Sequence, residues 1–121
     1  MPDSPIHSIN AVTLATHDMA RAIAFYEALG FDKKYGGPDA HISSFYCGES
    51  FLNVVIAPKD KPIHWWGRVI FHVDDVDAMF ARFNQHGFDT ETSPRDAEWG
   101  ERYFHALDPD GHELSFAKFL A

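Results

Sequence analysis

The chain has 121 residues, which is enough for one compact domain and too few for two ordinary ones. Its 45% hydrophobic and 15% aromatic content excludes a disordered chain. Its single cysteine excludes an intramolecular disulfide, and no apolar run is long enough to span a membrane. The formal net charge of −8 repels phosphate backbones and so disfavours nucleic acid as a partner. We therefore expect a cytoplasmic protein with no nucleic-acid or membrane partner, and with a small molecule as its ligand.

The first predicted elements are a strand and a helix. Residues alternate between two faces over Ala11–Ala15, as in a strand with one buried side. Asp18 is a suitable N-cap for a helix that runs to about Leu29, and Gly30 supplies the left-handed residue that ends it. Turn residues then separate three short predicted strands, Phe31–Tyr35, His41–Cys47 and Phe51–Ala57.

The second half of the chain repeats this order. A constant offset of 57 residues takes Val12 to Val69, Asp18 to Asp75 and Gly30 to Gly87. The elements predicted there are a strand, a helix and three further strands: Arg68–Val73, Val76–Gln85, Phe88–Thr92, Glu101–Leu107 and Glu113–Phe119.

The repeat defines the fold class. We expect an α+β protein made of two tandem βαβββ modules, over residues 9–57 and 67–119, joined by a polar linker at residues 58–66. Residues 1–121 then form a single domain.

Four features together carry a resemblance to a known family. They are the first strand followed by Asp18, the segment Phe25–Phe31, the helix entry Val73–Val76, and Trp99-Gly100 leading to the turn Asp108–Gly111. In this combination the chain resembles the vicinal oxygen chelate superfamily, which includes glyoxalase I, extradiol dioxygenases and bleomycin-resistance proteins. The resemblance implies a curled mixed sheet around a central cleft, usually in a homodimer.

The resemblance also implies where a metal would bind. In metal-dependent members each module supplies ligands from its first and last strands, and these positions fall here on Ala11, Asn53, Arg68 and Ser115. Ala11 has no donor atom, Arg68 is a permanent cation, and Asn53 and Ser115 are weak ligands by themselves. We expect the metal site to be lost, with no cofactor and no catalytic residue, which favours a binding protein over an enzyme.

The metal-free branch of the family suggests a function. Bleomycin-resistance proteins use the cleft to sequester a bulky, cationic, flat-ringed drug without altering it, and the acidic composition of this chain suits such a ligand. We expect a cleft for a bulky aromatic or amphiphilic molecule, with a role in antibiotic resistance. Arg68 and Glu113 are expected to form a charged pair in this cleft. Asn53, His72 and Ser115 are expected to hydrogen-bond to the ligand. Phe51, Trp66 and Trp99 are expected to form its apolar walls.

Several alternatives stay open. Arg68 either pairs with Glu113 or holds a carboxylate of the ligand, so the sign of the ligand's charge is not fixed. Adjacent residues of an extended segment point in opposite directions, so only one of Trp65 and Trp66 faces the ligand, and we favour Trp66. Trp99 is either a cleft wall or a cap on a hairpin. The alternative functions are a metal-dependent glyoxalase-type lyase, isomerase or dioxygenase with an atypical metal site, and a structural or regulatory module with a filled cleft.

Overall fold

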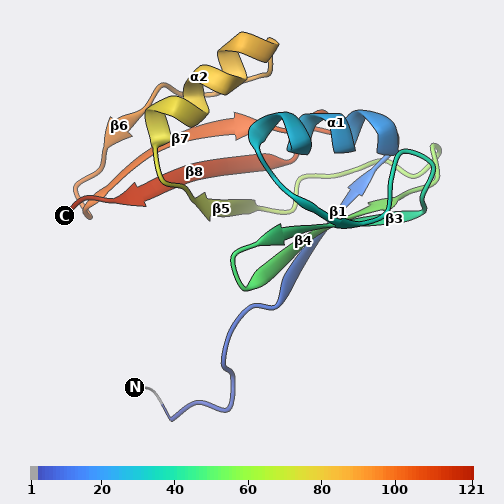
Figure 1. Cartoon of the computed structure of the whole chain (residues 1–121), viewed down its shortest axis with the longest axis horizontal. Helices are drawn as coiled ribbons and strands as arrows, with labels where there is room; N and C mark the ends of the chain where they lie inside the picture. Colours follow the sequence, from blue (N-terminus) through green and yellow to red (C-terminus); the bar gives the residue numbers. More distant parts are fainter. Residues whose placement is uncertain (1–2) are drawn as a thin grey trace.

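A computed structural model describes residues 3–121, so Met1 and Pro2 of the expected domain lie outside the described residues. It contains two helices and eight strands in the order βαβββ, twice (Figure 1). The first module consists of β1 (Ala11–Thr16), α1 (Met19–Leu29), β2 (Lys33–Tyr35), β3 (Ile42–Cys47) and β4 (Ser50–Ile56). The second consists of β5 (Arg68–His72), α2 (Val76–His86), β6 (Arg95–Asp96), β7 (Glu101–Leu107) and β8 (Glu113–Phe119).

Each module forms its own four-stranded mixed sheet. Sheet A has the strand order β1-β4-β3-β2 and sheet B has the order β5-β8-β7-β6. In both sheets the first strand pairs in parallel with the last strand of its module, and the remaining pairs are antiparallel. The α+β class and the duplicated βαβββ order expected from the sequence are confirmed.

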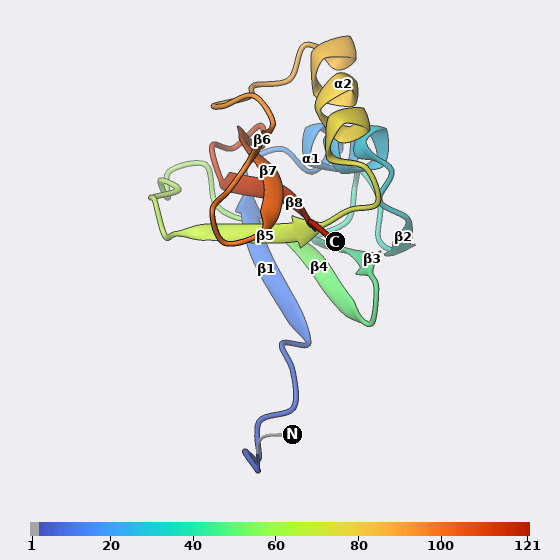
Figure 2. The same cartoon turned by 90° about the vertical axis from the view of Figure 1, so that its left-hand side faces the viewer.

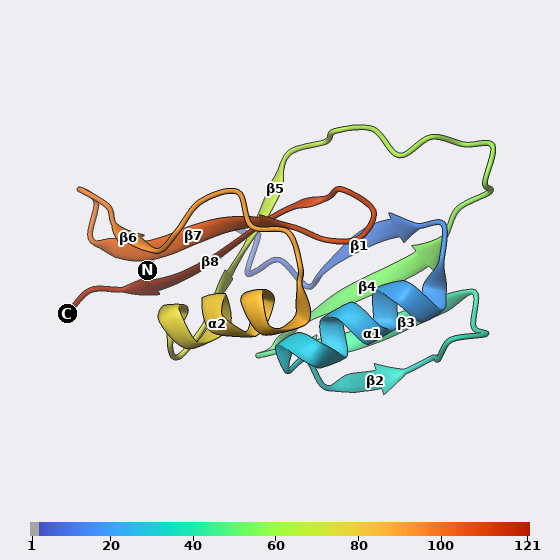
Figure 3. The ribbon, with the colours of Figure 1, turned by 90° about the horizontal axis from the view of Figure 1, so that it is seen from above.

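Both helices lie on the same side of the two sheets (Figures 1 and 3). They meet through Phe25 of α1 and Phe83 of α2, whose ring centroids are 5.7 Å apart. Phe83 also packs edge-to-face on Phe104 of β7 and lies 5.5 Å from Phe116 of β8. Because successive strand residues alternate between faces, every second side chain of each sheet points away from this core.

The helix ends follow the predicted signals. Asp18 accepts a hydrogen bond from the Arg21 amide at the start of α1, and Asp75 accepts one from the Ala78 amide at the start of α2. Gly30 ends α1 at φ +103° and Gly87 ends α2 at φ +69°, both in the left-handed region. Neither helix within residues 3–121 has the length and apolar character needed to cross a membrane.

One predicted strand is wrong. The segment 88–92 forms only an isolated bridge between Thr90 and Ala106, and the edge strand of sheet B is instead β6. The amides of both Glu91 and Thr92 donate to the carbonyl of His105, which leaves no regular ladder there. Pro94, which has no amide hydrogen, then separates this segment from β6.

Candidate functional site

The candidate site lies on the side of sheet B that faces away from the helices. Leu114 and Phe116 of β8 point into the core and are fully buried, so Glu113 and Ser115 point to the other face. The strand register aligns them with Arg68 and Ile70 of β5 on one side, and with Leu107 and His105 of β7 on the other. We call this surface the sheet-B face; its polar and aromatic residues are Arg68, His72, Glu91, Trp99, Glu101, Tyr103, His105, Glu113 and Ser115.

Arg68 is the centre of this face. Its guanidinium forms ion pairs with Glu113 at 3.1 Å and with Glu91 at 3.5 Å. It also donates to the carbonyl oxygen of Leu114 at 2.9 Å and to Oγ of Ser115 at 3.1 Å. The pair between Arg68 and Glu113 expected from the sequence is thus present, and two carboxylates around one guanidinium leave an excess negative charge.

His105 extends this network along β7. Its Nδ1 lies 2.7 Å from Oγ of Ser115, so one hydroxyl connects the imidazole to Arg68. Burial lowers the pKa of His105, and the positive charge of Arg68 lowers it further. The imidazole is therefore neutral at pH 7 and adds no positive charge to the face.

An aromatic platform occupies the other end of the face. Trp99 stacks on Tyr103 at 5.7 Å between centroids and 27° between planes, and 69% of Trp99 is exposed. The Arg95 guanidinium lies over the Tyr103 ring, and its Nε donates to the Tyr103 hydroxyl at 2.9 Å. Glu101 accepts from the Trp99 indole at 2.9 Å and lies 2.7 Å from Nε2 of His72. A flat surface next to carboxylates results.

The two tryptophans of the linker separate as expected for adjacent extended residues. The Trp65 indole donates to Oε2 of Glu113 at 2.6 Å, so this side chain joins the sheet-B face. The Trp66 indole donates to Nδ1 of His112 at 2.7 Å and lines a different cavity, between the linker and sheet A.

The residues expected to bind the ligand divide between these surfaces. Five of the eight gather on the sheet-B face: Arg68, His72, Trp99, Glu113 and Ser115. Asn53 and Phe51 are on β4 of sheet A, where Asn53 donates to Oγ1 of Thr13 and the Lys34 ammonium lies 4.1 Å from the centroid of the Phe51 ring. Trp66, the eighth residue, lines the cavity between the linker and sheet A. Whether each of the eight contacts a ligand remains a prediction.

The residues at the family's metal-ligand positions do not fit a divalent cation. Arg68 places a guanidinium beside Ser115, and that positive charge repels a metal ion. Ala11 carries no donor atom, and Asn53 offers only a neutral amide oxygen, which is a weak ligand by itself. Within residues 3–121 no group of three or more His, Cys, Asp or Glu side chains has the geometry to hold a metal.

Sequence reasoning missed four of the residues that define this face, Glu91, Glu101, Tyr103 and His105. It also favoured Trp66 over Trp65, and Trp65 is the one that joins the face. Tyr103 and His105 could have been found, because they alternate with Phe104 and Ala106, which are buried. Glu91 and Trp65 lie in irregular segments, where no periodicity indicates the direction of a side chain.

Comparison with known proteins places the chain in a family. The sequence profile of the Glyoxalase/Bleomycin resistance protein/Dioxygenase superfamily matches residues 8–116. The protein therefore belongs to this superfamily. No match was found among curated proteins.

Solved structures share the fold over nearly the whole chain. TioX from Micromonospora sp. ML1 is 26% identical with a TM-score of 0.76, and the alignment covers 94% of this chain and 100% of TioX. A lactoylglutathione lyase from Agrobacterium tumefaciens is 23% identical (TM-score 0.75, coverage 95% and 96%). A bleomycin resistance determinant encoded on the transposon Tn5 is also 23% identical (TM-score 0.74, coverage 93% and 98%).

Proposed function

We propose that this protein binds a flat, cationic aromatic small molecule on the sheet-B face, without a metal ion and without altering the ligand. The single observation that carries the proposal is that the Arg68 guanidinium already forms ion pairs with two carboxylates, those of Glu113 and Glu91. A ligand carboxylate would have to compete with two carboxylates of the protein, whereas a ligand cation gains from their excess charge.

The aromatic platform supports the shape of the ligand. Trp99 stacks on Tyr103 and offers a flat surface that is 69% exposed, and the carboxylate of Glu101 lies at its edge. Stacking of a flat ring on an aromatic pair contributes about 0.5–1.5 kcal/mol beyond surface burial, and a cation over a tryptophan ring contributes a comparable amount. Both contributions favour the same class of ligand.

The fold alone does not choose between binding and catalysis, because it is shared with a lyase and with a resistance determinant. The side chains favour binding, since a lyase or dioxygenase of this family needs a metal where this chain has Ala11 and Arg68. We propose also that the protein is a homodimer, in which the second copy helps to enclose the ligand.

Titration with proflavine, a flat aromatic cation, tests the ligand class. We expect saturable binding with quenching of tryptophan fluorescence, and a Kd at least tenfold higher for Trp99→Ala. Glu91→Gln removes one carboxylate from Arg68 and should raise the Kd about fivefold, which corresponds to about 1 kcal/mol. Tyr46→Ala, which removes an exposed aromatic side chain from sheet A, serves as the matched control and should leave the Kd unchanged.

Two results would contradict the proposal. One is preferential binding of an aromatic carboxylate that depends on Arg68 and Trp99, which would show that the guanidinium recognises the ligand. The other is stoichiometric, tightly bound metal in protein purified without chelator, or tight uptake of nickel, zinc or manganese on add-back. We expect neither, because no side chain at the four family positions is a strong ligand.

A further inference from the structure

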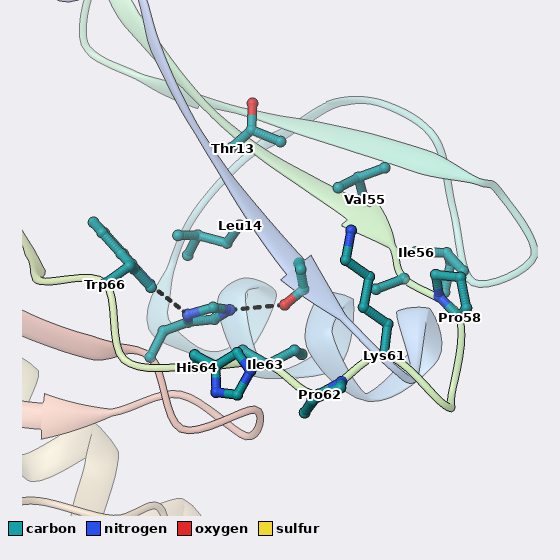
Figure 4. Close-up of a pocket in the computed structure, with 13 residues that line it drawn as sticks. Thr13, Leu14, Val55, Ile56, Pro58, Lys61, Pro62, Ile63, His64 and Trp66 are labelled. Atoms are coloured by element: carbon teal, nitrogen blue, oxygen red, sulfur yellow. Dashed lines mark hydrogen bonds between the residues drawn. The ribbon is translucent and has the colours of Figure 1, made fainter.

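A second cavity lies between the linker and sheet A, and the sheet-B face does not account for it. Its volume is about 400 Å³, within the range of small-molecule sites. Its floor comes from the outward side chains Thr13, Ala15 and Val55 of β1 and β4, and the linker covers it with Pro58, Ile63 and Trp66 (Figure 4). We call it the linker cavity.

Hydrogen bonds fix the linker over this cavity. The linker loops out beyond the ends of β1 and β4 before it returns to β5 (Figure 3). Near its middle, Nε2 of His17 lies 2.8 Å from the carbonyl oxygen of Lys61. At its far end the Trp66 indole donates to Nδ1 of His112, whose Nε2 donates in turn to the Ala15 carbonyl at 2.7 Å. Since an indole nitrogen can only donate, this chain of bonds fixes the tautomer of His112 with its proton on Nε2.

The charge of the linker cavity is opposite to that of the protein. No Asp or Glu is among the side chains that line it, although the chain as a whole carries a net charge of −8. Its one permanently charged group is the ammonium of Lys61, which extends across the cavity toward Val55 (Figure 4). Among the described residues no carboxylate lies within ion-pair distance of that ammonium. The remaining surface is largely apolar.

We propose that the linker cavity is a second binding site, for an apolar molecule that carries one carboxylate. The carboxylate binds the Lys61 ammonium, and the apolar body lies against Val55, Ile63 and Trp66. This ligand differs in charge from the one proposed for the sheet-B face. The two sites share no lining residue, so either can be correct without the other.

Calorimetric titration with 2-naphthoate tests this site on the whole protein. We expect saturable binding, with 2-naphthalenemethanol, the uncharged analogue, binding at least tenfold more weakly. Lys61→Gln should raise the Kd for 2-naphthoate about tenfold. Lys59→Gln is the matched control, because it removes the same charge from an exposed linker position that does not line the cavity, and it should leave the Kd unchanged.

Nuclear magnetic resonance of the indole groups locates the ligand. We expect 2-naphthoate to shift the Trp66 indole signal, assigned from the spectrum of Trp66→Phe, and to leave the Trp99 signal in place. The proposal is overturned if Lys61→Gln and Lys59→Gln have equal effects, if the alcohol binds as tightly as the acid, or if only Trp99 responds. It is also overturned if 2-naphthoate does not bind at millimolar concentration, as when a second copy of the chain fills the cavity.

Discussion

Tyr26 and Asp108 form a buried polar pair that connects the two modules. The Tyr26 hydroxyl on α1 donates to Oδ2 of Asp108 at 2.7 Å, and both residues are buried. The other carboxylate oxygen accepts from the amides of Asp110 and His112, which holds the turn after β7. Burial raises the pKa of both side chains, so the hydrogen bonds are what make this carboxylate tolerable in the interior.

Removal of the Tyr26 hydroxyl should therefore be costly. We expect Tyr26→Phe to lower the free energy of unfolding by about 1.5–3 kcal/mol, because it leaves a carboxylate oxygen buried without that donor. Urea denaturation measures the change. Tyr46→Phe removes a hydroxyl from a half-exposed tyrosine and should change stability by less than about 0.5 kcal/mol. Equal effects of the two substitutions would show that the pair with Asp108 does not contribute.

Individual contacts differ in how far the sequence predicts them. The pair between Arg68 and Glu113 is predictable, because both residues lie in strands of strong alternation and share a face. Glu91 reaches Arg68 from an irregular segment after α2, and its contribution depends on tertiary structure that no local pattern encodes. The carboxylate of Glu91 gives the site its excess negative charge, and the proposed class of ligand depends on that charge.

The connection between β2 and β3 depends on one glycine. Gly36 has φ +98°, and a Cβ built there would lie 2.6 Å from the Ser43 Cα and 2.3 Å from its Oγ. Its neighbour Gly37 has no atom within 4 Å of the corresponding position and is not in the left-handed region. A side chain at Gly36 would therefore clash with Ser43 and strain the backbone, whereas one at Gly37 would do neither.

This contrast gives a paired prediction. We expect Gly36→Ala to destabilise the protein by about 2–4 kcal/mol, from left-handed strain and from the clash with the Ser43 backbone. Gly37→Ala should be neutral, or stabilising by up to about 1 kcal/mol, because it only restricts the unfolded chain. Thermal and urea unfolding of both variants check this. A tolerant Gly36 would mean that β2 can move away from β3 without loss.

Elements with regular periodicity were predictable almost to the residue. Both helices, β1, β3, β4, β5, β7 and β8 lie within two residues of the predicted bounds, since capping signals and alternation coincide there. The predicted strand at 88–92 failed because alternation of side chains says nothing about whether the partner strand has free hydrogen-bonding groups. The carbonyl of His105 takes two amides from this segment, and regular pairing stops.

The molecule as a whole leaves apolar surface open between its two modules. A groove of about 190 Å³ lies where β1 approaches β5, with Ile9, Ala11, Phe51 and Ile70 among its lining residues. Ile70 is 61% exposed although it is in the middle of a strand, and Ile9 belongs to an arm that leaves the body below β1 (Figure 2). Exposed isoleucines gathered at one groove are typical of a surface that another protein covers.

We propose a second copy of the chain as the cover, and sedimentation equilibrium tests it. The expected mass at micromolar concentration is twice the 13.7 kDa of one chain. Burying the exposed 61% of Ile70 contributes about 1–2 kcal/mol per copy, and a twofold dimer buries it twice, so Ile70→Asp should shift the equilibrium to monomer. Tyr35→Ser removes a similarly exposed apolar side chain from β2, at the edge of sheet A opposite β1, and should leave the dimer intact. A monomeric wild type, or an equal response to both substitutions, would contradict a dimer built on this groove, because only one of the two side chains lines it.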